Sequence, residues 1–154
     1  MEEDISPFPL HSSKSLEFGT VVIDDREQFA NKERFPLAGE VKLGDFISMT
    51  RSIEFREIDC AVIITRGHEH DEAVLKEVLS KGRMPGYIGM IGSREKIATT
   101  FSRLKQQGVS EQLLVRVKAP IGLDIGARTP AEIAISIMAE IVAHRYGKLP
   151  EQKV

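Results

Sequence analysis

Four arginines follow stretches of the sequence that have the pattern of buried strands. Arg26, Arg66, Arg94 and Arg128 each come just after one of these stretches. Because ligands of parallel sheets bind beyond the carboxyl ends of the strands, we expect the four side chains to converge on one rim. The guanidinium group can pair with two phosphate oxygens at once. The spacing therefore predicts a site for an anion that carries phosphate.

The turn after the segment YIGMI (87–91) carries the strongest signal for such an anion. Gly92 and Ser93 predict a tight strand-to-helix turn, and Arg94 and Lys96 stand at the opening of the helix. The free N–H groups and the positive dipole end of a helix attract anions. Cationic side chains at this end are unfavourable for the helix itself. Two of them here indicate an anionic ligand.

Two aspartates end the first predicted strand, which lies in the segment FGTVVIDD. At this place in a dinucleotide-binding fold, a carboxylate accepts hydrogen bonds from ribose hydroxyls. Asp24 and Asp25 have the position for that role. The alternative is a pair of solvated acids that begin a turn, and the sequence favours neither interpretation.

Histidines follow the next predicted strand, in the segment TRGHEHDE (65–72). His68 and His70 flank Glu69, which brings metal-binding residue types together. Histidines two positions apart do not share a helix face, however, and a third ligand is not evident nearby, so no metal is predicted. We expect a neutral His68 that orients a polar ligand, or else exposed histidines near a helix start.

The segment APIGLDIGARTPAE (119–132) offers a fourth group of site residues. Gly122 and Gly126 bracket Asp124, and Arg128 precedes the start of the last helix. This glycine spacing predicts a compact loop with exposed backbone amides. The alternative is a tight connection into the helix. Asp124 can be a general base, an acceptor for a ligand hydroxyl or a turn residue.

Strands and helices alternate in the elements that must position these residues. Runs of β-branched and other apolar residues predict strands at 20–24, 39–43, 59–65, 87–91 and 114–119. The run at 59–65 is typical of a strand that is covered on both faces. Apolar residues spaced by three and four predict helices over 70–81 and 94–107, which Gly82 and Gly108 end.

The last helix has the clearest local signature. Thr129, Pro130 and Glu132 are the residues of an N-cap, a first turn and a capping box. The residues at 44–58 give no clear pattern, and no helix is predicted there. Alternating strands and helices predict an α/β fold, a Rossmann-like three-layer sandwich with a mostly parallel sheet.

Composition limits the remaining classes of function. The 154 residues suffice for one domain, and the formal net charge of -2 gives no general attraction to nucleic acid or to anionic membranes. The single cysteine, Cys60, cannot form an internal disulfide and is expected to pack within its strand. Without a signal peptide or an apolar run of membrane length, the chain is expected in the cytoplasm.

Three segments resemble the C-terminal Rossmann-like domain of the XdhC/CoxI family, the xanthine dehydrogenase accessory factors. They are VVIDDREQFANKERFP, YIGMIGSREK and APIGLDIGARTPAEIAISIMAEI, and the resemblance runs from Phe18 to Arg145. It implies a protein that binds molybdenum cofactor and delivers it to a molybdenum hydroxylase such as xanthine dehydrogenase. The positions that match the family are Asp24, Asp25, His68, Gly92–Arg94 and Gly122–Thr129.

The family pattern begins with a strand and a glycine-rich turn that are not found here, so the domain is expected to be truncated at its N-terminus. In a sheet of order 3-2-1-4-5-6, the missing strand lies between those at 20–24 and 59–65. The N-terminal tail fills this slot, or the two strands close up, or a partner chain donates a strand. A separate chain that supplies the absent N-terminal half also remains open. We expect a loose tail at 1–17, the domain at 18–148 and a second tail at 149–154.

Two other functions remain open from the sequence. An NAD(P)-dependent oxidoreductase needs the absent glycine fingerprint and a proton donor such as His68. A non-catalytic protein that has lost its pocket is expected to form a stable oligomer. Homo-oligomers are also expected if the protein is an accessory factor.

Overall fold

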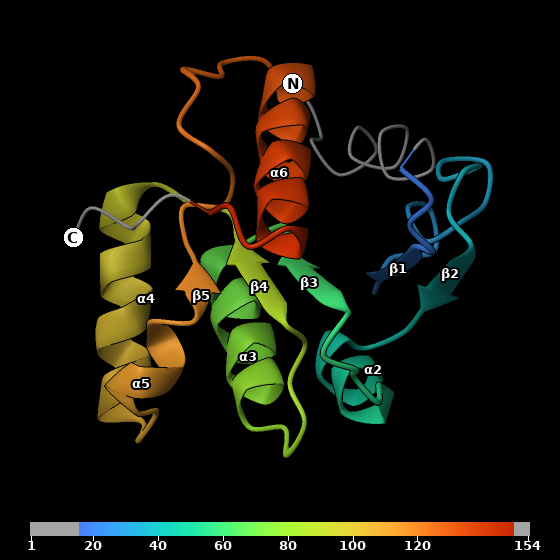
Figure 1. The fold of residues 1–154 in the computed structure, drawn as a ribbon. Helices are drawn as coiled ribbons and strands as arrows, with labels where there is room; N and C mark the ends of the chain where they lie inside the picture. The colour runs from blue at the N-terminus through green and yellow to red at the C-terminus, as the bar shows by residue number, and fades with distance from the viewer. Residues whose placement is uncertain (1–15, 150–154) are drawn as a thin grey trace.

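Parallel strands form two separate sheets within residues 16–149, the part of the chain that the computed structural model describes (Figure 1). In the smaller sheet, β1 (Val21–Asp24) pairs with β2 (Glu40–Leu43). The larger sheet has the order β3-β4-β5, and its strands are Cys60–Ile63, Tyr87–Met90 and Val117–Lys118. Every neighbouring pair is parallel, as predicted.

Helices cover both faces of the larger sheet and create three layers. Ile88 and Met90 of β4 pack on one face, with side chains of α3 (His68–Leu79), α4 (Arg94–Gln106) and α5 (Glu111–Leu114). Tyr87 of the same strand packs on the other face, against α6 (Pro130–Arg145). Successive side chains of a strand point to opposite faces, so β4 joins both cores. The predicted α/β class is confirmed.

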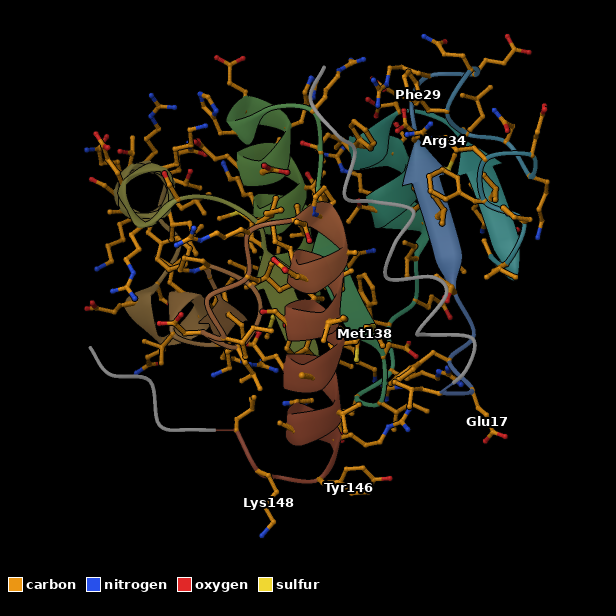
Figure 2. All side chains as sticks on the ribbon, turned by 90° about the horizontal axis from the view of Figure 1, so that it is seen from above. Glu17, Phe29, Arg34, Met138, Tyr146 and Lys148 are labelled. Carbon is orange, nitrogen blue, oxygen red and sulfur yellow. The ribbon has the colours of Figure 1, made fainter. Side chains whose placement is uncertain are left out.

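The smaller sheet has an apolar cluster of its own. Phe35 and Ala38 are buried there, with Val22 and Val41 packed against them. Figure 2 shows this sheet beside α6 and the larger sheet, with Phe29 and Arg34 near the arrowhead of β1. The Arg34 guanidinium lies 4.9 Å from the Phe29 ring centre. The smaller sheet is therefore a packed unit that borders the larger one.

Local capping explains where the helices around the predicted site begin. The Thr129 side chain accepts a hydrogen bond from the Glu132 amide at 3.2 Å, and Glu132 accepts one from the Thr129 amide at 2.9 Å. This capping box, with Pro130 in the first turn, starts α6 as predicted. Ser93 caps α4 in the same way, because its hydroxyl accepts from the Lys96 amide at 3.3 Å.

The sequence interpretation missed two helices. The segment 44–58 contains α2 (Phe46–Ser52), which Asp45 caps by accepting a hydrogen bond from the Ser48 amide at 2.8 Å. Residues 111–114 form the short helix α5, so the strand predicted at 114–119 is shortened to Val117–Lys118. Another correction concerns α3, which begins at His68 instead of His70 and ends before Ser80, so Gly82 does not terminate it.

β3 packs against both cores, as expected, because Ile63 lies in the core on the α3 side, and Cys60 and the following Ile64 pack on the α6 side. The cover is incomplete, since Val62 keeps 39% of its surface exposed. Within residues 16–149, β1 and β3 are not paired with each other, so these two strands have not closed the gap predicted between them. The predicted tails at 1–17 and 149–154 fall almost wholly outside the described residues, and so does the prediction that the N-terminal tail fills the slot. Between residues 16 and 149, no helix is long and apolar enough to cross a bilayer.

Candidate functional site

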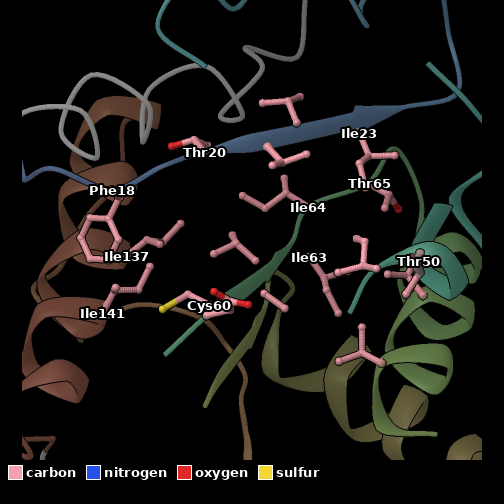
Figure 3. Close-up of a pocket in the computed structure, with 18 of the residues that line it drawn as sticks. Phe18, Thr20, Ile23, Thr50, Cys60, Ile63, Ile64, Thr65, Ile137 and Ile141 are labelled. Carbon is pink, nitrogen blue, oxygen red and sulfur yellow. The ribbon is translucent and has the colours of Figure 1, made fainter. Parts of the chain in front are cut away.

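A cavity of about 1920 Å³ opens between β1 and β3 (Figure 3). Apolar side chains of β1, β3 and α6 form much of its wall, among them Ile23, Ile63 and Ile137. At the carboxyl ends of the strands, three arginines line it, and we call them the arginine rim: Arg26, Arg66 and Arg128. Each follows a different strand, so residues far apart in sequence share one cavity.

Asp25 connects two strand ends at this rim. Its Oδ2 atom accepts a hydrogen bond from Nη2 of Arg66 at 2.8 Å, although 41 positions separate the two residues. Its Oδ1 atom is buried without a hydrogen-bond partner among the described residues and lies 3.9 Å from Nε of Arg26. Buried carboxylate oxygens normally accept hydrogen bonds. This oxygen of Asp25 therefore has an unused acceptor position, but Asp25 itself does not line the cavity.

Asp24 has a different role from its neighbour. Its carboxylate accepts hydrogen bonds from the amide, Nε and Nη2 of Arg26, each at 3.0 Å. The Arg26 guanidinium also lies 3.8 Å from the Phe29 ring centre. A carboxylate that accepts from the backbone two positions ahead forms a local turn. Asp24 thus orients Arg26 and starts the turn, which matches the alternative that the sequence left open.

The start of α3 is organised by Asp71. The Oδ1 atom of this buried side chain accepts a hydrogen bond from the Thr65 amide at 2.9 Å. Gly67, the residue before the helix, provides no side-chain cap. Burial raises the pKa of the Asp71 carboxyl above its ordinary value, whereas the Thr65 hydrogen bonds lower it. This contact fixes the backbone from which Arg66 projects.

Replacing Asp71 by asparagine is expected to become more favourable as the pH rises. A raised native pKa means that the folded state disfavours the charged form of Asp71. The stabilising contribution of Asp71 in the parent protein is therefore present at low pH and is lost as the pH rises through the raised pKa. Asp71→Asn keeps an acceptor for Thr65 without the charge. In urea unfolding, the stability difference between Asp71→Asn and the parent should favour the variant more at pH 7 than at pH 3. An equal difference at the two pH values would contradict this prediction.

The two histidines of this segment do not act together. His68 is the exposed first residue of α3. The His70 ring packs edge-on against Phe46, with ring centres 5.6 Å apart. His70 therefore has a packing role, and the prediction that His68 orients a ligand stays a prediction. The described part of the chain contains no group of three or more His, Cys, Asp or Glu residues that could hold a metal ion.

The turn at Gly92–Arg94 lies at the same edge of the larger sheet but outside the cavity. It follows β4, the neighbour of β3, and leads into α4 (Figure 1). Ser93 and Arg94 are exposed. Unlike Arg66 and Arg128, Arg94 does not line the cavity between β1 and β3. The four arginines predicted to share one rim are thus divided between the cavity and this turn.

The loop that leads to Arg128 is held by hydrogen bonds to Ser136 of α6. The Leu123 amide donates to the Ser136 carbonyl at 3.2 Å, and the Ser136 hydroxyl donates to the Leu123 carbonyl at 2.7 Å. Gly122 makes this approach possible: its φ is +97°, and a Cβ there would lie 2.2 Å from the Ser136 hydroxyl. Asp124 and Gly126 are exposed beyond this anchor.

Glu140 also anchors the loop, and sequence reasoning missed it. Its Oε1 atom accepts hydrogen bonds from the Tyr87 hydroxyl at 2.6 Å and from the Gly122 amide at 3.1 Å. The residue is 8% exposed. A signal existed, because Glu140 lies on the apolar stripe of α6, three positions after Ile137 and seven after Ile133. A carboxylate on a buried stripe needs partners.

Residues 5–141 match the XdhC Rossmann domain, which is most of the chain. The chain belongs to this family. It is 32% identical over 133 residues to the uncharacterized protein YqeB of Escherichia coli K12, a match that covers 85% of this chain and 24% of YqeB. It is 30% identical over 128 residues to a probable xanthine dehydrogenase subunit of Bacillus subtilis 168, covering 83% of this chain and 36% of that protein.

A solved structure gives the same fold. The crystal structure of a xanthine dehydrogenase from Bacillus halodurans matches with a TM-score of 0.79 and 28% identity, over 97% of this chain and 42% of that chain. The XdhC Rossmann domain described here thus spans less than half the length of each of these relatives. The Rossmann-like fold and the family resemblance that the sequence predicted are confirmed.

Proposed function

We propose that the arginine rim binds an anionic cofactor that carries phosphate, with the molybdenum cofactor as the leading candidate. On this proposal, the protein is an accessory, chaperone-type factor for a molybdenum hydroxylase such as xanthine dehydrogenase. One observation carries the proposal: Arg26, Arg66 and Arg128, which follow three different strands, line one cavity at the carboxyl ends of those strands.

The residues present fit the chemistry of this cofactor. Arg66 and Arg128 offer charged N–H donors to a phosphate, and the ion pair with Asp25 orients the Arg66 guanidinium. Apolar side chains deeper in the cavity can pack against the flat ring of a pterin. When bound, the cofactor supplies the molybdenum centre, and the chain's residues bind and orient it.

The relatives support the accessory role. Two of them, one in Bacillus subtilis and one in Bacillus halodurans, carry names that connect them with xanthine dehydrogenase. The chain also belongs to the XdhC family that its sequence resembles. That resemblance implies an accessory factor for the same enzyme.

Binding is tested with the full chain by equilibrium dialysis against molybdopterin, AMP, GDP, NADH and inorganic phosphate. We expect molybdopterin to bind most tightly. Arg66→Gln and Arg128→Gln are each expected to weaken it by about tenfold to a hundredfold, because a charged hydrogen bond contributes roughly 1.5–3 kcal/mol.

Arg83→Gln is the matched control, since Arg83 is exposed in the loop between α3 and β4 and does not line this cavity. It should bind like the parent protein. The proposal fails if none of the five compounds binds, or if Arg83→Gln weakens binding as much as Arg66→Gln. Preference for NADH over molybdopterin would favour the oxidoreductase alternative.

A further inference from the structure

A second groove lies at the amino ends of the strands of the larger sheet, at the edge opposite the arginine rim. Its volume is about 540 Å³. Three of its lining residues come from separate places: Glu57 before β3, Arg116 directly before β5 and His144 in the last turn of α6. The others, Gly82, Arg83, Met84 and Gly86, belong to the loop between α3 and β4, which Figure 1 shows at the end of the sheet away from the arrowheads. We call this opening the amino-end groove.

Two arginines of this groove are exposed and have no carboxylate partner. Among residues 16–149, the Arg83 side chain has no hydrogen bond or ion pair, and Arg116 has one polar contact, from Nη1 to Sδ of Met84 at 3.8 Å. Sulfur is only a weak acceptor. Glu57 is the single carboxylate that lines the groove, and it pairs with neither arginine. Both guanidinium groups are therefore available for a carboxylate from another molecule.

The most exposed large apolar side chains between residues 16 and 149 flank this groove in the sequence. They are Ile58, Tyr146 and Val115, which are 77%, 67% and 63% exposed. Each stands one or two positions from a residue that lines the groove. Exposed apolar groups beside charged ones are typical of surfaces that bind other proteins, where tyrosine, methionine and arginine are enriched.

The backbone around the groove is held in place by packing. Pro85, within the loop between α3 and β4, is fully buried. The Tyr87 amide donates to the Asp59 carbonyl at 3.4 Å, which attaches the end of this loop to the segment before β3. The His144 ring packs against the Tyr87 ring, with centres 5.5 Å apart. Because these walls are ordered in advance, a ligand does not have to order them on binding.

We propose that the amino-end groove is the docking site for a partner protein that presents carboxylates flanked by apolar side chains. Charge complementarity determines the carboxylates, because two unpaired arginines line the groove with a single acidic residue. The exposed apolar side chains determine the flanking residues. This interaction is separate from the proposed cofactor binding, since Arg83 and Arg116 do not line the cavity of the arginine rim.

A polypeptide suits this groove better than a small molecule does. Met84 is the sole large apolar side chain among the lining residues. Pockets for small molecules, in contrast, are lined mostly by apolar side chains that enclose the ligand. An extended polypeptide can place a carboxylate on the arginines and cover the apolar side chains beside the groove at the same time.

Two fluorescein-labelled peptides with amidated C-termini test the proposal on the full chain without any cofactor. One has the sequence GLEVDLG, and the other, GLQVNLG, has amides in place of both carboxylates. We expect GLEVDLG to bind one-to-one in fluorescence anisotropy, at least tenfold more tightly than GLQVNLG. Added salt should weaken its binding, because ion pairs in an open groove are screened.

Variants of the groove and of the opposite edge locate the binding. Arg83→Gln and Arg116→Gln are each expected to weaken GLEVDLG binding about threefold to tenfold, because exposed ion pairs contribute modestly. Val115→Ser should also weaken it. Arg94→Gln is the matched control, since Arg94 is an exposed arginine that lines neither cavity. It should bind the peptide like the parent protein.

The peptide test and the cofactor test have opposite patterns, so they fail separately. Arg83→Gln should lose peptide binding and keep cofactor binding, whereas Arg66→Gln should keep peptide binding and lose cofactor binding. If Arg66→Gln also weakened peptide binding as much as Arg83→Gln, the peptide would not be in the amino-end groove, and the docking proposal would be wrong.

Several other results overturn the docking proposal. Absence of GLEVDLG binding, or equal binding of the two peptides, would mean that the arginines do not recognise carboxylates of a polypeptide. Displacement of GLEVDLG by an equimolar amount of inorganic phosphate or of a single-stranded oligonucleotide would indicate a general anion site. Removal of residues 150–154 that tightens peptide binding at least tenfold would assign the groove to the chain's own C-terminal segment. Peptide binding that is lost in a dimer, measured by light scattering, would assign it to a second copy.

Discussion

Gly122→Ala is expected to lower the free energy of unfolding by roughly 2–4 kcal/mol. Two causes act at this position. The backbone has a φ of +97°, which side-chain-bearing residues rarely adopt, and a new Cβ would lie 2.2 Å from the Ser136 hydroxyl and 3.2 Å from the Ile137 amide. The amide belongs to α6 and cannot move independently. Urea denaturation followed by circular dichroism measures the change.

Gly126→Ala is the matched control, because it separates the two causes. Gly126 also has a positive φ, +74°, but a Cβ there would meet nothing within 4 Å. It should therefore show the backbone cost alone, about 1–2 kcal/mol. If the two variants lost the same stability, the close approach of the loop to α6 would not matter. Since Arg128 follows this anchor in the same loop, Gly122→Ala should also weaken cofactor binding.

The elements that could be predicted are those with local causes. The capping box at Thr129 and the buried run at 87–91 determine α6 and β4 through neighbouring residues, and both are found. The helix at 46–52 was missed because its signal is short: one cap at Asp45 and buried side chains at Phe46 and Thr50. The lengths of β3 and β5 depend on their partner strands, which sequence patterns do not contain.

The candidate site shows the same division. The rule that strand ends meet at one edge placed Arg66 and Arg128 correctly beside one cavity. It could not show that Arg94 leads away, because α4 packs on the face opposite α6. Nor could it assign partners: Asp24 orients Arg26, whereas Asp25 reaches Arg66. Which of two adjacent carboxylates is left with a free acceptor depends on side-chain geometry that appears only in the fold.

Glu140→Ala is expected to destabilise the protein by roughly 2–6 kcal/mol. Each donor left without its acceptor costs about 1–3 kcal/mol when buried, and Oε1 of Glu140 serves two, the Tyr87 hydroxyl and the Gly122 amide. Tyr87 is 1% exposed, so water cannot readily replace the lost acceptor. Chemical denaturation of the variant measures the loss.

Two further variants show whether hydrogen bonding is the cause. Glu140→Gln keeps an acceptor oxygen and should recover most of the stability that Glu140→Ala loses. Tyr87→Phe should cost less in the Glu140→Ala background than in the parent protein, because the hydroxyl it removes is already unpaired there. Equal costs in both backgrounds would mean that Glu140 stabilises the loop without Tyr87.

Burial raises the pKa of Tyr87 above its ordinary value, and the Glu140 hydrogen bond raises it further. The hydroxyl therefore remains a donor throughout the pH range of these measurements, and the coupling between the two residues should not vary with pH through loss of that proton.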